Sequence, residues 1–537
     1  MKRYEEWMRQ EGWCREILPF LLFLVWEILS WITVFWQTGG RFLVYSYHQV
    51  GERTFYKSVL QDMRFQILTV VGIFLLIQIL LVVHSYRHLY CWGRILIPVF
   101  TLMQMGMMIQ LCTEGRFVKH SILLFTGILL MLLFAVISCA EIGKRGIAVT
   151  AAGIFLLMAA NLLFGVTING SRAWILLPVI HMTVQPGEFL KVLDIILVSI
   201  GYKEIQSRMW IRRLALVTWV SEIAVLVMVE DLGNALTILI LGTGCILAFN
   251  IWDTLMWILC LGIAAGTGLT GLAIVSSGVR MRLVRAADRF LMINTVLLDP
   301  EAEKNFRRVL LAVVRSGLKG SGFRNGEYAW HMNTMAANSD YAILAVASIF
   351  GIAGVAVVLA ALVVLLKNAD SNRYVHSSSQ FISGKLAAIV LALHAGIHIA
   401  AATNVGPLTG TTLPFVSDGG SSIWANSMLI GIMLGNCLPE KRRTVWAKRL
   451  HCLMDPKVQA IADAGERAGE TAGGLAMTAA YMGRRTGDSV TELVHRGAEM
   501  LIQAVTIPDE EDKNEKNGYE KERNQEDEKK ESQTDCK

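Results

Sequence analysis

Apolar runs long enough to cross a lipid bilayer recur along most of this sequence, and they constrain the fold more than any other feature. A bilayer core needs about 20 apolar residues per helix. We expect spans near 17–36, 66–85, 93–112, 118–140, 147–167, 190–202, 214–229, 233–251, 255–275, 342–366, 382–402 and 423–438. Only 18% of the 537 residues are charged, which is less than a soluble domain of this size carries. The sequence therefore predicts an all-α, polytopic transmembrane helical bundle of about 12 spans, with a long outer loop before the tenth span.

Basic residues in the connecting segments predict the orientation of these spans. With the N-terminus in the cytoplasm, Lys and Arg gather in four inner loops and after the last span, as the positive-inside rule requires. The loop after the first span disagrees, since it contains Arg41, Arg53, Lys57 and Arg64. We expect both termini in the cytoplasm and residues 168–189, 230–233, 276–341 and 403–422 outside. No small-residue cleavage site follows the first apolar run, so it reads as a retained span.

Polar, Gly and Pro residues gather in four patches at the predicted outer edge of the bundle. Non-helical backbone at membrane depth needs hydrogen-bond partners from protein or water, so these patches are candidate sites. The first patch comprises residues 169–174 and 185–191. Within it, Glu188 and Lys191 share one helical face. That pair is either functional or a local ion pair. In the second patch, residues 230–235, Asp231 either caps the next span or acts in catalysis.

The third patch combines a glycine-rich basic stretch, residues 316–326, with Asp340 at the mouth of a span. Partial desolvation there would raise the pKa of this carboxyl toward the range of a general base, although N-capping is an alternative role. Residues 276–340 hold ten basic and six acidic residues, a net charge of +4. This excess predicts an anionic partner such as a phosphate, or else a solvated basic face.

The fourth patch is PLTGTTLPFVSDGGSS, residues 407–422, a hydroxyl-rich turn between two spans. The preceding span carries His394 and His398, four residues apart on one helical face. A metal pair would lack a third ligand at suitable spacing, so we expect helix-packing hydrogen bonds instead. The nine cysteines are scattered without metal-site or disulfide spacing and are expected to be core residues.

Together the four patches resemble the SEDS family of bacterial shape, elongation, division and sporulation proteins, the FtsW, RodA and SpoVE type. The run 407–422 is similar to the last outer loop of that family. Arg172-x-Trp174 with Gln185-Pro-x-Glu-x-x-Lys191 resembles an earlier outer loop, and Asp231-Leu-Gly-x-Ala235 resembles the Pro-Asp-Leu-Gly turn. Ser339-Asp-Tyr341 resembles the Thr-Asp-Phe segment. The four occur in the order of the family, over roughly half of the chain.

The resemblance implies a peptidoglycan glycosyltransferase that inverts the anomeric centre and polymerises lipid II, the undecaprenyl-pyrophosphate-linked disaccharide-pentapeptide. Asp340 would be the general base. The residues expected to bind substrate are Arg172, Gln185, Glu188, Lys191, Asp231, Lys319, Arg324, Thr409, Ser417, Asp418, Ser421 and Ser422. No protein metal ligands are assigned, although a divalent Mg²⁺ or Mn²⁺ could help to offset the charge of the leaving pyrophosphate.

The resemblance also implies a multi-pass protein of the bacterial plasma membrane, with its active site on the outer face. We expect a class B penicillin-binding protein, a single-span transpeptidase, as partner, and no nucleic acid. The expected regions are 1–146, an N-terminal transmembrane region with two spans beyond the ten of the family; 147–438, the catalytic core; 439–507, a cytoplasmic amphipathic helical tail; and 508–537, a disordered charged tail.

The chain departs from the family pattern at several positions. Asp418 stands where the family usually has Tyr, Met335-Ala-Ala-Asn338 where it has Pro-Glu-Ala-His, and Ser348-Ile349 where it has two Glu. His394 and His398 replace Gln and Asn.

Two alternatives to the polymerase follow from these observations. One is a lipid II flippase or transporter, which needs a polar path through the bilayer, and few ionisable residues such as Glu222 lie within the predicted spans. The other is a non-catalytic scaffold of a cell-wall synthesis complex. The sequence does not distinguish elongation from division or sporulation.

Overall fold

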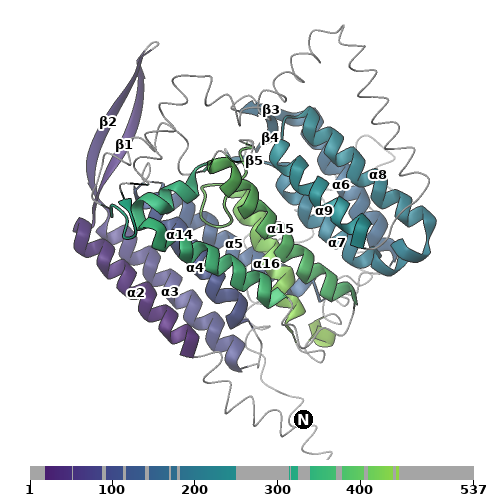
Figure 1. Ribbon diagram of the computed structural model, residues 1–537, viewed down its shortest axis with the longest axis horizontal. Coiled ribbons are helices and arrows are strands. Elements are labelled where there is room, and N and C mark those ends of the chain that lie inside the picture. Colours follow the sequence, from purple (N-terminus) through teal and green to yellow (C-terminus); the bar gives the residue numbers. More distant parts are fainter. Residues whose placement is uncertain are drawn as a thin grey trace, which may run out of the picture. The chain divides into compact units, whose positions relative to one another are not determined.

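The computed structural model describes residues 18–50, 53–87, 92–112, 116–139, 144–168, 171–177, 182–248, 314, 316–323, 339–369, 378–403, 405, 409–438 and 443–446. Its helices are α2 (Leu18–Thr38), α3 (Arg64–Arg87), α4 (Gly93–Cys112), α5 (Phe117–Ile137), α6 (Lys144–Phe164), α7 (Pro186–Ser207), α8 (Met209–Met228), α9 (Leu232–Ala248), α14 (Ala342–Ala369), α15 (Ser378–Ala402) and α16 (Gly420–Asn436) (Figure 1). Within these residues, seven helices are long and apolar enough to cross a membrane. The predicted polytopic helical bundle is confirmed.

One predicted span is wrong in its length. The span expected at 190–202 is the 22-residue helix α7, which begins at Pro186. Proline fits the first position of a helix because its missing N–H would have no partner there. The span expected at 255–275 and nearly all of the tail from 439 onward lie outside the described residues.

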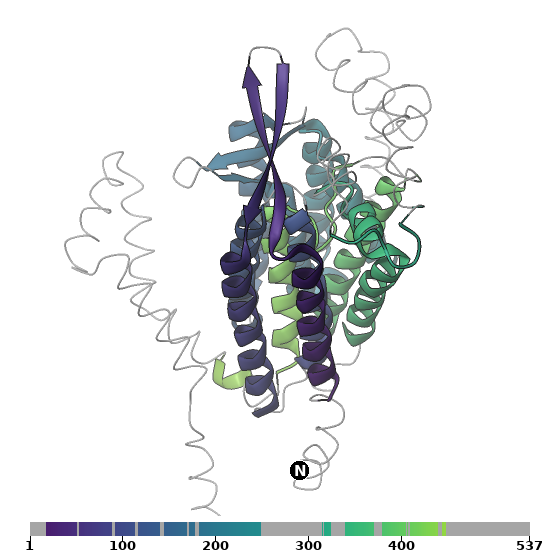
Figure 2. The same cartoon turned by 90° about the vertical axis from the view of Figure 1, so that its left-hand side faces the viewer.

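Two small antiparallel sheets accompany the helices, where the sequence analysis expected only loops. Strands β1 (Arg41–Val50) and β2 (Arg53–Asp62) form a hairpin whose pairing runs from Arg41–Asp62 to Val50–Arg53. Figure 2 shows this hairpin extending past the ends of α2 and α3. Strands β3 (Gly165–Ile168), β4 (Ser171–Leu177) and β5 (Met182–Val184) form the second sheet between α6 and α7. Both segments are rich in the aromatic and β-branched residues that favour strands.

Glycines allow α16 to pack closely along α5. A Cβ atom on Gly431 would overlap the carbonyl oxygen of Met131, and one on Gly435 would overlap that of Ala135. Small residues at such positions bring helix backbones together, which is the main source of helix association within a bilayer.

Helix α14 breaks at Gly351, whose φ of 69° lies in the left-handed region. The segment 316–323 fills this break with main-chain hydrogen bonds. Ser321 N donates to Ser348 O at 2.8 Å and Gly322 N donates to Ile349 O at 3.1 Å, while Ile352 N donates to Gly317 O at 3.1 Å. The broken helix is therefore satisfied by protein, as irregular backbone in a membrane protein must be.

The side chain and the main chain of Glu27 join α2 to α3 and α4, respectively. Glu27 is fully buried and its Oε1 accepts a hydrogen bond from Gln78 Nε2 at 3.2 Å. Gln104 Nε2 donates to the carbonyl oxygen of Glu27 at 3.4 Å. Asp194 in α7 and Glu222 in α8 are also fully buried. The predicted spans thus bury Glu27 and Asp194 as well as Glu222, the example named from the sequence.

Candidate functional site

The polar patches meet at one end of the bundle, here called the polar end. It comprises residues 165–168, 171–177, 182–185, 229–231, 339–341 and 409–419. Ser171 Oγ in β4 donates to the carbonyl oxygens of Val229 and Glu230, both at 3.1 Å. Gln185 Nε2 donates to Asp231 Oδ2 at 2.9 Å, and Gln185 N donates to Ser421 Oγ at 2.9 Å. Segments that lie up to 236 positions apart in the sequence are therefore in contact.

Asp231 caps helix α9. Its Oδ1 accepts a hydrogen bond from the backbone N–H of Asn234 at 3.4 Å, the third residue of the helix, as an N-cap does. The amide of Asn234 donates to both carboxylate oxygens, at 3.1 and 2.9 Å. Burial raises the pKa of this carboxyl, although the hydrogen bonds from Asn234 and Gln185 lower it. The capping role that the sequence left open for Asp231 is confirmed.

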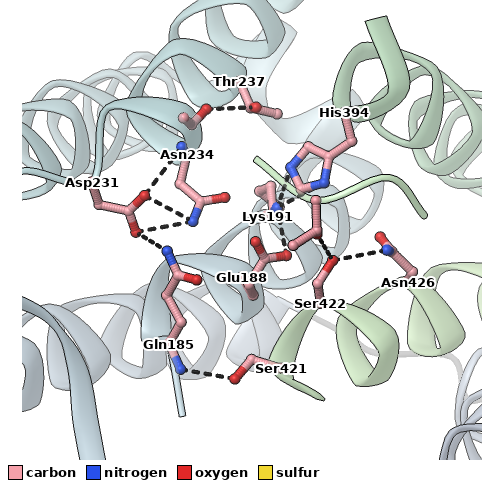
Figure 3. Close-up of polar contacts among 12 residues, drawn as sticks. Gln185, Glu188, Lys191, Asp231, Asn234, Thr237, His394, Ser421, Ser422 and Asn426 are labelled. Carbon is pink, nitrogen blue, oxygen red and sulfur yellow. Dashed lines mark hydrogen bonds and ion pairs between the residues drawn. The ribbon is translucent and has the colours of Figure 1, made fainter. Parts of the chain in front are cut away.

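Lys191 and Glu188 form an ion pair inside the bundle, one turn apart on α7. Lys191 Nζ lies 2.9 Å from Glu188 Oε2, and the two side chains are 1% and 4% exposed. Lys191 Nζ also contacts both ring nitrogens of His394 on α15, as Figure 3 shows. The local ion pair, one of the two roles that the sequence left open, is present, and it is buried within the bundle. His394 was expected to make helix-packing hydrogen bonds and it does.

Asp340 lies two residues before the start of α14, and Ser339 next to it is bound to the last predicted outer loop. Ser417 Oγ donates to the carbonyl oxygen of Ser339 at 2.7 Å and accepts from Leu413 N at 2.8 Å. Burial raises the pKa of Asp340, and a hydrogen bond from Ser339 partly opposes that rise. The same burial, together with the charge of Asp340, raises the pKa of Tyr341. A carboxyl with a raised pKa is suited to accept a proton near neutral pH.

Asp418 joins the last loop to the start of α5. Arg116 Nη1 lies 3.2 Å from Asp418 Oδ2, and His120 Nδ1 lies 3.9 Å from Oδ1. Burial raises the pKa of Asp418, but His120, Lys119 and Arg116 outweigh it and hold this pKa at about 2. Arg116 and His120 were not among the predicted site residues. Their only signal was charge at the start of an apolar span, opposite a loop far away in the sequence.

The remaining predicted site residues lie around these contacts. Arg172 is exposed, and its Nε donates to Gly165 O at 2.9 Å. Lys319 is exposed on the segment that fills the break in α14. Thr409 Oγ1 pairs with Thr411 Oγ1 at 2.5 Å. Ser422 Oγ accepts from Thr412 Oγ1 at 2.5 Å and from Asn426 Nδ2 at 3.1 Å. Arg324 and most of the basic outer loop lie outside the described residues.

The part of the chain that the structure describes contains no group of three or more His, Cys, Asp or Glu side chains able to hold a metal ion. Cys139, Cys245 and Cys437 are buried core residues, as expected.

Comparison with known proteins places this geometry in context. The family model described as cell cycle protein, FtsW/RodA/SpoVE, matches residues 86–437. The probable peptidoglycan glycosyltransferase FtsW of Halomonas elongata is 26% identical over 379 residues, 65% of this chain and 91% of the relative. The peptidoglycan glycosyltransferase RodA of Mycobacterium bovis is 27% identical over 290 residues, 49% of this chain and 57% of the relative.

Two solved structures are similar to the chain. One is a chain of a peptidoglycan synthase complex, described for its structural coordination of polymerization and crosslinking, with a TM-score of 0.47 and 21% identity over 64% of this chain and 96% of that one. The other is the rod shape determining protein RodA of Thermus thermophilus, with a TM-score of 0.43 and 21% identity over the same shares. The family match begins at the end of α3, so α2 and nearly all of α3 precede it.

Proposed function

Because the chain belongs to the FtsW, RodA and SpoVE family of cell cycle proteins, we propose that it polymerises glycan strands from lipid II at the outer face of the bacterial cell membrane. The predicted family is confirmed, and the chain is a multi-pass membrane protein and a peptidoglycan glycosyltransferase of cell-wall synthesis. The observation that carries the finer proposal is the position of Asp340, a carboxylate with a raised pKa that Ser339 and Ser417 join to the last predicted outer loop.

Asp340 acts as the general base of this reaction. It removes the proton from the acceptor sugar hydroxyl while that oxygen attacks the anomeric carbon of the donor, so that a new glycosidic bond forms and the bond to the lipid pyrophosphate breaks with inversion. The proton ends on Asp340 and the electron pair leaves with the pyrophosphate. General-base assistance of this kind contributes about 10²- to 10⁴-fold in rate.

Cations offset the negative charge that develops on the leaving pyrophosphate. Arg172 and Lys319 are exposed and able to approach a phosphate. Lys191 is buried and already neutralised by Glu188, so its contribution is to organise the site from within. Arg116 is likewise paired with Asp418. The apolar helices provide the surface along which the prenyl chains of donor and acceptor lie.

The biological setting of the proposal follows the family. Both termini lie in the cytoplasm, and a class B penicillin-binding protein crosslinks the strands that this chain makes. The role is in elongation, division or sporulation. A divalent metal, Mg²⁺ or Mn²⁺, bound through the substrate pyrophosphate would share the neutralising role of the cations, since Mg²⁺ commonly binds to substrate phosphates.

Polymerisation by the purified full chain tests the proposal. Lipid II is supplied in detergent, with and without Mg²⁺ or Mn²⁺, and glycan strands are resolved on a gel. We expect Asp340→Asn to lower the rate at least about a hundredfold. The matched control is Asp62→Asn, since Asp62 is a half-exposed carboxylate at the end of β2, and this variant should keep wild-type activity. Normal strands from Asp340→Asn would refute the assignment of the base.

A lipid transporter or a scaffold would give different results in the same preparations. Movement of lipid II across liposomes without any glycan product would favour transport. Inactivity of the wild-type chain, both alone and with its transpeptidase partner, would favour a scaffold.

A further inference from the structure

His398 on α15 contacts both the last loop and the start of α14. Its Nδ1 lies 2.8 Å from the carbonyl oxygen of Thr411 in the last loop, and the backbone N–H of Ile343 in α14 points at its Nε2 at 3.3 Å. The side chain is fully buried.

These two partners determine the proton positions on the ring. A carbonyl oxygen only accepts hydrogen bonds, so Nδ1 carries a proton. A backbone N–H only donates, so Nε2 carries none. His398 is therefore a neutral imidazole in a single tautomer. A protonated ring would have a donor at each nitrogen and could not accept the hydrogen bond from Ile343.

The hydrogen bond to Ile343 restrains the start of α14. The first four N–H groups of a helix have no partner within the helix, and Ile343 is the second residue of α14. Ser417 holds the other side of the same segment through Ser339 O at 2.7 Å. Asp340 thus lies between two restrained positions, one residue after Ser339 and three residues before Ile343. Thr411 and Ser417, which complete both restraints, belong to the same loop.

We propose that His398 is a positioning residue for Asp340. It joins the last loop to the first turn of α14 and so fixes the segment that carries the general base. This inference rests on the proposed function for the role of Asp340, but the restraint on the backbone is measurable without catalysis. Its effect is on the rate of the chemical step rather than on lipid II binding, because misplacing a catalytic group by about 1 Å can lower a rate about a hundredfold.

Two substitutions separate positioning from packing. His398→Leu keeps a side chain of similar size but makes it apolar and so removes both hydrogen bonds. His398→Gln places an amide, with a donor and an acceptor, near the positions of the ring nitrogens. The matched control is Ser383→Ala on the same helix, which removes the hydrogen bond from Asn436 Nδ2 at 2.9 Å.

The full-length variants are compared by lipid II polymerisation and by hydrogen exchange of peptides that cover residues 339–346. We expect His398→Leu to lower kcat about tenfold to a hundredfold with little change in KM, and to speed exchange in those peptides. His398→Gln should restore both readouts to near wild type, and Ser383→Ala should leave both unchanged.

Two results would overturn the inference: unchanged kcat and exchange in His398→Leu, or equal losses in His398→Leu and His398→Gln. Failure of the proposed function is distinguishable, because Asp340→Asn would then remain active. If Asp340→Asn is inactive while His398→Leu is normal, only the positioning role is refuted.

Discussion

Removing one partner of the buried ion pair between Lys191 and Glu188 should destabilise the protein far more than removing both. In Lys191→Met the side chain keeps similar length, but Glu188, only 4% exposed, loses a cation 2.9 Å away. An uncompensated buried charge costs about 3–5 kcal/mol. In the double variant Lys191→Met with Glu188→Gln, no charge remains to desolvate. Replacing a buried pair as a whole is often neutral or stabilising, so we expect the free energy of unfolding to return to within about 1 kcal/mol of wild type.

Denaturant titration of the purified proteins in one detergent measures these differences, with lipid II polymerisation measured in parallel. Arg64→Met is the surface control, because Arg64 and Asp62 form an ion pair at 3.7 Å with both side chains about half exposed. Its loss should cost no more than about 1 kcal/mol. The reasoning is refuted if Lys191→Met costs as little as Arg64→Met, or if the double variant is as unstable as the single one. A stable but inactive double variant would support the role of the pair in organising the site from within.

Three further predictions concern the polar end and the break in α14. Burial raises the pKa of Asp340 above its usual value. Because a general base must be ionised, the polymerisation rate should fall as the pH is lowered through that raised pKa, and a pH–rate profile measures this. The pKa of Asp418 is lowered to about 2, so the ionised side chain stabilises the folded protein fully above pH 3.8, and this contribution is lost as the pH falls through about 2. At neutral pH, Asp418→Asn should lower the free energy of unfolding by about 1 kcal/mol, a small amount because its partner Arg116 is half exposed. Gly351→Ala should lower it by at least about 1–2 kcal/mol because of the positive φ and an overlap with Leu318 O, whereas Gly396→Ala, with open space around it, should not be destabilising.

The apolar pattern of the sequence predicted most helices because a helix that crosses a bilayer needs a long, uninterrupted run of apolar residues. It failed at α7. Glu188 precedes the predicted span 190–202 and Lys191 and Asp194 lie within it, so the apolar signal there is short and weak, yet all three side chains are buried among helices. Hydropathy scales treat a charged residue as exposed, and only the tertiary structure shows that these side chains are buried and that Lys191 pairs with Glu188.

The polar end was predictable in membership but not in its contacts. The motifs placed Asp340, Asp231 and Ser417 at one membrane face, and their order in the chain implied proximity. The contacts of Lys191 with His394 and of Asp418 with Arg116 join residues that lie 203 and 302 positions apart, and neither pair has a spacing that a single sequence could reveal. The hairpin β1–β2 was missed because a short stretch of mixed polarity between two spans reads equally well as a loop.

Glu27 has a consequence for the biogenesis of this protein. An acidic residue in the centre of an isolated helix costs about 2.5–3.5 kcal/mol to transfer from the insertion machinery into lipid. The Glu27 carboxylate accepts a hydrogen bond from Gln78 of α3, which offsets part of that cost once α3 is beside α2. Helix α2 is therefore expected to wait at the translocon until α3 has been synthesised, so that the two helices enter the bilayer as a unit.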